Sequence, residues 1–206
     1  MSFATSFARA LVPAAILVAP AAVNASSASD LNLVKAHLRS VDSMTASFTQ
    51  TDSKRRTMSG TLQLKRPGRI RFEYGGGVDV LLVANGKTLT FLDYDVGQKS
   101  SWDLNKTPLG ILLADNPNLD RIAKIVPNKD PRVVVVNAVN PAHREYGRLV
   151  LAFIREPNSP GGLRLYGWTA IDAQGKQNVV KLSNQRYNVA IPASAFTYAE
   201  PKKKGR

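Results

Sequence analysis

The segment Lys65-Arg66-Pro67-Gly68-Arg69-Ile70-Arg71-Phe72-Glu73-Tyr74 gives the clearest structural signal in this chain. Apolar and aromatic residues at 70, 72 and 74 alternate with charged ones, which is the period of a β-strand with one buried face. Arg66-Pro67-Gly68 predicts a turn that leads into the strand. An apolar face beside clustered cations suits a ligand with an apolar body and an anionic or carbonyl-rich head, although the same cations are equally typical of a solvent-exposed strand edge protected by charge.

Strand patterns continue on both sides of this segment. Asn85-Gly86 predicts a hairpin, because both residues tolerate the positive φ of a two-residue turn, and Gln174-Gly175 predicts a second one. The remaining strands are expected at 46–50, 60–64, 79–84, 88–92, 98–104, 133–136, 148–154, 163–171 and 178–188.

Helical patterns are few and short. Asp30 is expected to cap a helix whose apolar stripe is Leu31, Val34, Leu38 and Val41. In the segment 107–113 a threonine that can cap, a proline suited to the first helical turn and several leucines predict a short apolar helix. Residues 118–124 are expected to add a turn or two.

Many consecutive strands with two or three short helices exclude a doubly wound α/β fold, which needs regular alternation. The pattern favours a mainly β fold, a strongly curved antiparallel sheet that forms an incomplete β-barrel with the helices across its concave side. No repeat or long linker divides the chain, so residues 26–206 are expected to form a single domain.

The first 25 residues read as a signal peptide. Arg9 supplies a positive start, an apolar run from Leu11 to Val23 follows, and small residues before and at Ala25 suit cleavage there. A membrane anchor is the competing interpretation, but the run is short and contains two prolines. An exported chain without cysteine is expected in the periplasm, with no disulfides.

The chain is strongly basic. Its formal net charge is +13, and removal of Arg9 with the signal would leave 13 − 1 = +12. Such a charge suits nucleic acid, anionic lipid surfaces or acidic proteins, and export argues against nucleic acid. Lys202, Lys203, Lys204 and Arg206 form a basic C-terminal tail, interpreted either as a solvated end or as a weak attraction to anionic headgroups.

We find no pattern that indicates an enzyme. The two histidines, His37 and His143, lack metal-ligand spacing with another His or Cys, and no nucleophile elbow or phosphate-binding loop occurs. We therefore expect no metal and no cofactor. Arg66 stands out from the other cations, because a guanidinium beside a turn proline can reach a rim and donate forked hydrogen bonds to an ester or amide oxygen.

Several motifs, taken in order, resemble those of the periplasmic outer-membrane lipoprotein carrier proteins, the LolA-like family. The similarity covers most of the chain after residue 25. It rests on Ser47-Phe48-Thr49-Gln50, on the Arg-Pro strand motif within 60–72, on Asn85-Gly86-Lys87-Thr88-Leu89, and on Thr107-Pro108-Leu109 with Leu112-Leu113.

The resemblance implies an incomplete β-barrel closed by a helical lid. It implies a monomeric periplasmic chaperone that accepts acylated lipoproteins from an inner-membrane ABC transporter and passes them to an outer-membrane acceptor. In the family the arginine of the Arg-Pro motif, here Arg66, holds the lid by hydrogen bonding to helix backbone and acts in cargo transfer.

We assign candidate site residues on this basis. Lid closure and transfer are expected to involve Arg66, Leu109 and Leu112. The apolar cavity is expected to be lined by Phe48, Leu62, Leu64, Ile70, Phe72, Leu89 and Phe91. Ile70 stands where the family commonly has an aromatic residue, so a carrier of another amphiphile, such as a glycolipid or sterol-like lipid, is an alternative function.

Overall fold

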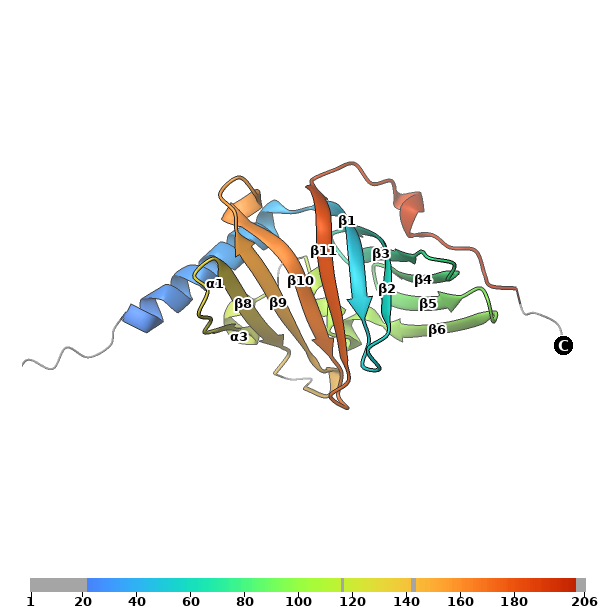
Figure 1. The fold of residues 1–206 in the computed structure, drawn as a ribbon, viewed down its shortest axis with the longest axis horizontal. Helices are drawn as coiled ribbons and strands as arrows, with labels where there is room; N and C mark the ends of the chain where they lie inside the picture. The colour runs from blue at the N-terminus through green and yellow to red at the C-terminus, as the bar shows by residue number, and fades with distance from the viewer. Residues whose placement is uncertain (1–21, 116, 142–143, 203–206) are drawn as a thin grey trace, which may run out of the picture.

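A computed structural model describes residues 22–115, 117–141 and 144–202. Eleven antiparallel strands form one sheet in the order β6-β5-β4-β3-β2-β1-β11-β10-β9-β8-β7 (Figure 1). The sheet is curved and unclosed, with β6 and β7 at its two ends. The strands are β1 (Ser43–Thr51), β2 (Thr57–Lys65), β3 (Arg69–Tyr74), β4 (Val80–Asn85), β5 (Thr88–Asp93), β6 (Gln98–Asp103), β7 (Ala123–Val126), β8 (Val133–Val139), β9 (Arg148–Arg155), β10 (Leu163–Ile171) and β11 (Gln177–Tyr187).

The helices of the concave side pack into the same apolar core as the strands. They are α1 (Ala22–Ser40), α2 (Leu109–Leu113) and α3 (Leu119–Ile122), with 3₁₀ turns η1 (Leu104–Lys106), η2 (Arg144–Tyr146), η3 (Pro160–Gly162) and η4 (Ala193–Phe196) elsewhere in the chain. Val34 of α1 and Leu112 and Leu113 of α2 are almost fully buried among inward-facing strand residues such as Leu62 and Phe153. The mainly β fold with an incomplete antiparallel barrel is thus confirmed.

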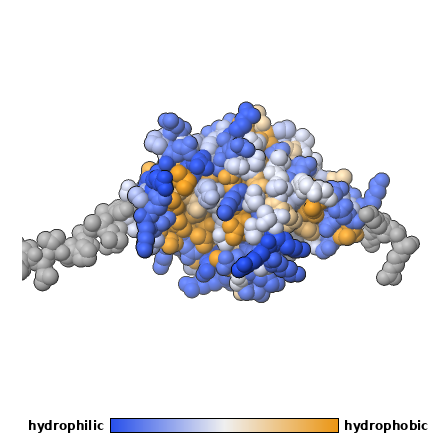
Figure 2. Space-filling model, in the orientation of Figure 1, coloured by the Kyte–Doolittle hydropathy of each residue, from blue (hydrophilic) through white to orange (hydrophobic). Residues whose placement is uncertain are grey.

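A second apolar cluster lies on the other face of the sheet. After β11 the chain turns back along β3–β5 (the red segment of Figure 1), and we call residues 188–202 the C-terminal strap. Ile191 and Phe196 of the strap bury against Leu81, Val83 and Leu92. In the same orientation, Figure 2 shows hydrophilic and apolar residues side by side over the visible surface.

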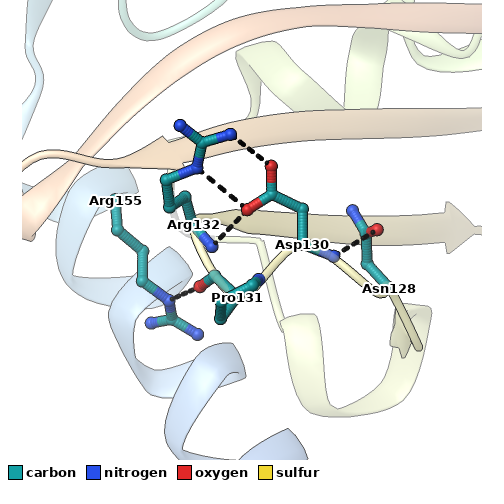
Figure 3. A network of polar contacts seen from close by, with 5 residues as sticks. All are labelled: Asn128, Asp130, Pro131, Arg132 and Arg155. Carbon is teal, nitrogen blue, oxygen red and sulfur yellow. Dashed lines mark hydrogen bonds and ion pairs between the residues drawn. The ribbon is translucent and has the colours of Figure 1, made fainter.

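A polar network joins the turn between β7 and β8 to the first helix. Asp130 accepts bonds from the Nε and Nη2 atoms of Arg132, at 3.0 and 2.8 Å, and these bonds lower the pKa of Asp130 to about 2 (Figure 3). Arg155 donates from Nε to the carbonyl of Pro131 at 2.9 Å and from Nη2 to the carboxylate of Asp30. The Arg155 guanidinium therefore ties α1 to this end of the sheet.

The predicted elements are largely confirmed, with three corrections. The first helix starts at Ala22, so Asp30 lies within it and pairs with Arg155 instead of acting as its cap. The hairpin at 85–86 forms, but Asn85 belongs to β4 and the two connecting residues are Gly86 and Lys87. Residues 123–126 form strand β7, which was predicted only as the end of a helical segment.

Three sequence expectations concern residues outside the described part. Residues 1–21 of the expected signal peptide, His143 and residues 203–206 of the basic tail lie there. Within the described ranges, no helix combines the length and apolar character required to cross a bilayer.

Candidate functional site: a concave-face groove and the Arg66 contact

An apolar groove of about 640 Å³ runs along the concave face beside α2. Its lining comes from strands β1–β5 and from β10 and β11, which are neighbours in the sheet because β11 pairs with β1. Its apolar and aromatic lining residues are Met58, Phe72, Tyr74, Val78, Val80, Leu82, Leu89, Phe91, Pro108, Leu109, Trp168, Ala170 and Val180.

Aromatic side chains form one wall of the groove. Phe72 meets Trp168 edge to face at 6.0 Å between ring centroids, and Phe48 meets Phe72 and Tyr74 edge to face, each at 5.1 Å. Such arrangements are favourable for aromatic pairs and hold the rings in fixed orientations. The wall is therefore apolar and preformed.

Polar groups in the lining come mainly from β1, the turn that follows it and β11. The Tyr74 hydroxyl donates to Oε1 of Gln50 at 2.8 Å, and burial raises the pKa of Tyr74 to about 12. Asp52 and the exposed Arg56 form an ion pair at 2.7 Å, and Asn178 lines the same groove. The groove thus offers an apolar length together with hydrogen-bonding groups for a polar head.

The structure divides the predicted cavity residues into two sets. Phe72, Leu89 and Phe91 line the groove, and so does Leu109 of the predicted lid. The others do not line it, because helices α1 and α2 fill the concave side above them with their own apolar side chains. This second set comprises Phe48, Leu62, Leu64 and Ile70, each at most 2% exposed, and Leu112 of the predicted lid is likewise buried in the core.

The turn between β2 and β3 holds both helices. The Arg66 guanidinium donates through Nη1 to the carbonyl of Leu38, near the carboxyl end of α1. Two residues later, the backbone N–H of Gly68 donates to the carbonyl of Leu113, the last residue of α2, at 2.9 Å. Both acceptors are carbonyls of the kind that a helix end leaves unpaired.

Burial of the Arg66 guanidinium costs free energy, because its charge is removed from water. Burial lowers its pKa to about 10, and the nearby carboxylates of Asp42 and Asp115 oppose that shift. Its Nε is buried and has no hydrogen-bond partner among the described residues. A buried cation with an unused donor contributes less to closure than a fully paired one, because desolvation offsets part of the bond.

The other cations of the strand face away from the groove. Arg71 donates from Nη1 to the carbonyl of Thr197 at 3.1 Å and from Nε to Glu73 at 3.1 Å, so it holds the C-terminal strap. The alternation in the sequence predicts Arg71 on the face opposite the apolar residues, and its contacts confirm that placement. In a strand, alternate side chains point to opposite faces, and the apolar residues occupy the inner one.

His37 lies on the first helix, as the sequence predicts, but the sequence does not reveal its burial or its contacts. It is buried on α1, its Nδ1 lies 2.8 Å from the carbonyl of Pro160, and its ring meets Phe153 and Tyr187 edge to face. Gly161, at φ +65°, lies so close that an added Cβ would come within 2.4 Å of the His37 backbone nitrogen. The close contact between α1 and η3 therefore requires glycine.

A family model described as "Outer membrane lipoprotein carrier protein LolA" matches residues 39–199. The chain belongs to the LolA family. The proposed resemblance is thus confirmed. The matched range includes the β2–β3 turn, the groove strands and α2, but begins near the end of α1.

Relatives agree with this assignment, and one solved structure shares the fold. The chain is 30% identical to an outer-membrane lipoprotein carrier protein of Chromobacterium violaceum, over 92% of this chain and 90% of that one. It is 26% identical to a protein of the same name from Albidiferax ferrireducens, over 84% and 88%. A DUF1329 family protein from Desulfovibrio piger shares the fold, with a TM-score of 0.50, 9% identity, and coverage of 87% of this chain and 99% of that one.

Within residues 22–115, 117–141 and 144–202, no three His, Asp or Glu side chains come together as metal ligands.

Proposed function

We propose that this protein is a periplasmic carrier that binds the acyl chains of lipoproteins released from the inner membrane and carries them to the outer membrane. The observation that carries the proposal is the apolar concave-face groove beside α2, in a chain that belongs to the LolA family. The curated relatives bear the name outer-membrane lipoprotein carrier protein. An inner-membrane ABC transporter and an outer-membrane acceptor are the proposed partners.

The groove suits part of an acyl chain rather than the complete cargo. Burying one methylene is worth about 0.8 kcal/mol, so a chain of about 16 carbons would gain on the order of 12 kcal/mol if fully buried. Two or three fully buried chains would exceed the affinities that proteins reach, and the cargo would not be released. Partial burial therefore suits a carrier.

Further space for cargo is proposed beneath α1 and α2. Leu62, Leu64 and Ile70 are covered there by side chains of the helices. Displacing the helices would expose this apolar surface to acyl chains, so that ligand contacts replace helix contacts. The loaded and empty states then differ little in free energy, so the protein can both take up cargo and release it.

Arg66 is proposed to set this balance. Its bond to Leu38 exists only when α1 lies on the sheet. Cargo that lifts α1 must break the bond and free the guanidinium, which can then donate to an ester or amide oxygen of the lipoprotein. Leu109, which lines the groove from α2, and Leu112, which lies in the core, would move with the helices.

The test is displacement of a fluorescent apolar probe by a synthetic diacylated lipopeptide. We expect the purified protein to take up the probe and to release it to the lipopeptide, but not to the same peptide without acyl chains. Leu82→Gln with Phe91→Gln, in the groove, should weaken lipopeptide binding about tenfold or more. Tyr166→Gln, at an exposed aromatic residue outside the groove, is the matched control.

Equal binding by the groove variant and the control would contradict the proposal. Mass spectrometry of lipids that co-purify from the periplasm distinguishes the cargo. Lipoprotein acyl groups support the proposed function, whereas a glycolipid or sterol-like lipid would replace it with the alternative carrier. Hydrolysis of the lipopeptide during the assay would contradict a purely carrying role.

A further inference from the structure

A pair of surface grooves lies beside α2 and α3. Two grooves meet there, of about 760 and 730 Å³, and they share four lining residues, Arg121, Ile122, Pro141 and Gly147. The first groove adjoins the concave-face groove only through Thr107 and Pro108 at the start of α2. The pair is therefore a continuous surface distinct from the groove proposed for acyl cargo.

The two grooves differ in chemistry. The first is largely apolar, with Pro108, Ile111 and Ala114 of the α2 segment facing Ile122 and Pro141. The second is cationic, and its lining contains four exposed basic side chains. They are Arg121, Lys124, Arg144 and Arg148.

The carboxylates of the cationic groove are already engaged. Asp120 accepts from Nζ of Lys35 at 2.6 Å, and Asp172 accepts backbone N–H groups of its own turn, at 2.9 Å from both Gln174 and Lys176. Among the described residues, no ion pair is formed by any of the four basic side chains. Four basic side chains and the carboxylate of Asp172, which no cation pairs with among the described residues, leave the groove with a net positive charge.

Four different parts of the fold bring these cations together, and Arg144 comes from η2. Arg121 comes from α3, Lys124 follows on edge strand β7, and Arg148 begins β9 opposite Val139 of β8 and Ile171 of β10. Arg121 lines both grooves, so it stands at the boundary between the apolar and the charged part. An amphiphile can therefore place its tail beside α2 and its anionic group among the cations.

From this arrangement we infer that the joined grooves bind one anionic phospholipid, with its phosphodiester at Arg121, Lys124, Arg144 and Arg148 and part of an acyl chain beside Ile111 and Ile122. The inference goes beyond the proposed function, because an acylated lipoprotein does not need a phosphodiester site. Charge complementarity selects the headgroup, and the apolar groove favours a lipid over a free anion.

The experiment uses the full chain and short-chain lipids kept below their micelle concentration. Binding of dihexanoyl phosphatidylglycerol is measured by calorimetry and located by backbone amide shifts. We expect saturable binding with shifts at residues 108–111, 120–124 and 144–148, weakened by added salt. Dihexanoyl phosphatidylcholine, with the same tails and no net charge, and glycerophosphoglycerol, with the same headgroup and no tails, should each bind about tenfold more weakly.

A matched pair of variants tests the cations. Arg121→Gln with Arg148→Gln should weaken phosphatidylglycerol binding about tenfold, while uptake of the fluorescent probe into the concave-face groove is unchanged. Lys181→Gln with Arg186→Gln removes the same charge from exposed positions of β11, outside both grooves, and should leave both measurements unchanged. Circular dichroism checks that each variant is folded.

Several outcomes would overturn the inference. Equal affinity for the two lipids would mean that the headgroup is not recognised, and equal affinity for glycerophosphoglycerol would mean a free-anion site. Shifts confined to the concave-face groove, or equal loss in the control variant, would also contradict it. Failure here with normal lipopeptide binding leaves the proposed carrier function standing, so the two proposals are tested separately.

Discussion

At the scale of single residues, Arg66 links the turn between β2 and β3 to helix α1. Its guanidinium is buried and donates a hydrogen bond to the carbonyl of Leu38 on α1. This hydrogen bond depends on the position of α1. In the proposed mechanism the side chain acts on the balance between closed and open forms rather than on the stability of the fold.

Replacing Arg66 with Leu should separate these two roles. We expect the free energy of unfolding to change by less than about 2 kcal/mol, because the lost bond is offset by the removal of a buried charge. Uptake of the apolar probe should rise, and transfer of bound lipopeptide to an acceptor membrane should fall. Arg66→Lys keeps a donor and should restore part of the transfer, whereas normal transfer by the leucine variant would refute this role.

His37 makes the stability depend on pH. Burial lowers its pKa below 6.5, and the charge of Arg66 adds to this effect, while the carbonyl of Pro160 opposes it. The unfolded chain then binds a proton that the folded chain resists, so the free energy of unfolding falls as the pH drops below about 6.5 and is level above it. Urea unfolding at pH 5.5 and 8 measures the difference.

His37→Gln is the matched variant for that measurement, since glutamine does not titrate but can donate to Pro160. We expect the variant to lose less stability than the parent protein between pH 8 and pH 5.5. An identical loss in both proteins would show that other groups cause the pH dependence.

At the scale of elements, the C-terminal strap covers the outer face of β3–β5. Phe196 is 3% exposed in the second apolar cluster, and the carbonyls around it accept bonds from Arg71. Lys99 adds an ion pair with Glu200 at 2.5 Å and lies over the Tyr198 ring. The strap therefore belongs to the folded domain.

Phe196→Ala should lower the free energy of unfolding by about 3 kcal/mol, since it removes a buried aromatic ring and leaves a cavity. Chemical denaturation measures this loss. Ala193→Ser, at an exposed position of the same 3₁₀ turn, should change stability by less than about 0.5 kcal/mol. A similar small effect of both changes would mean that the strap is detached in solution.

The sequence predicts elements better than it predicts what covers them. Alternation correctly placed residues 70, 72 and 74 on the inner face, and turn chemistry correctly indicated the hairpins. Periodicity does not distinguish a groove wall such as Phe91 from solid core such as Ile70, because both are apolar residues on the concave face. That difference depends on where α1 and α2 lie, which only tertiary contacts establish.

The sequence does not predict the packing of the strap or the contacts of His37, and the physical reason is related. Strap residues such as Ile191 lie far along the chain from the strands they cover, and they lack a repeating pattern. Arg66, in contrast, could be selected from its place before a turn proline, although its acceptor on α1 could not be derived from the spacing.

At the scale of the whole molecule, two apolar clusters lie on opposite faces of β3–β5. Because they share these strands, unfolding one face removes the support of the other. The domain should therefore behave as one cooperative unit.

Urea denaturation should show a single transition when it is followed by tryptophan fluorescence and by far-UV circular dichroism. Trp168 is buried on the concave face, whereas Trp102 on edge strand β6 is 49% exposed, so the fluorescence change comes mainly from Trp168. We expect its midpoint in urea to match that of far-UV circular dichroism. Two separate midpoints would contradict cooperative coupling of the two faces.

The position of β11 has a consequence for how the chain is made. This last strand pairs with β1 on one side and β10 on the other, so it joins halves built from earlier parts of the sequence. Strands β1 and β10 cannot be joined in one sheet until β11 has been synthesised, and such long-range pairing is intrinsically slow. A sheet with this connectivity is completed only after β11 has been synthesised, so its two halves are joined late in folding.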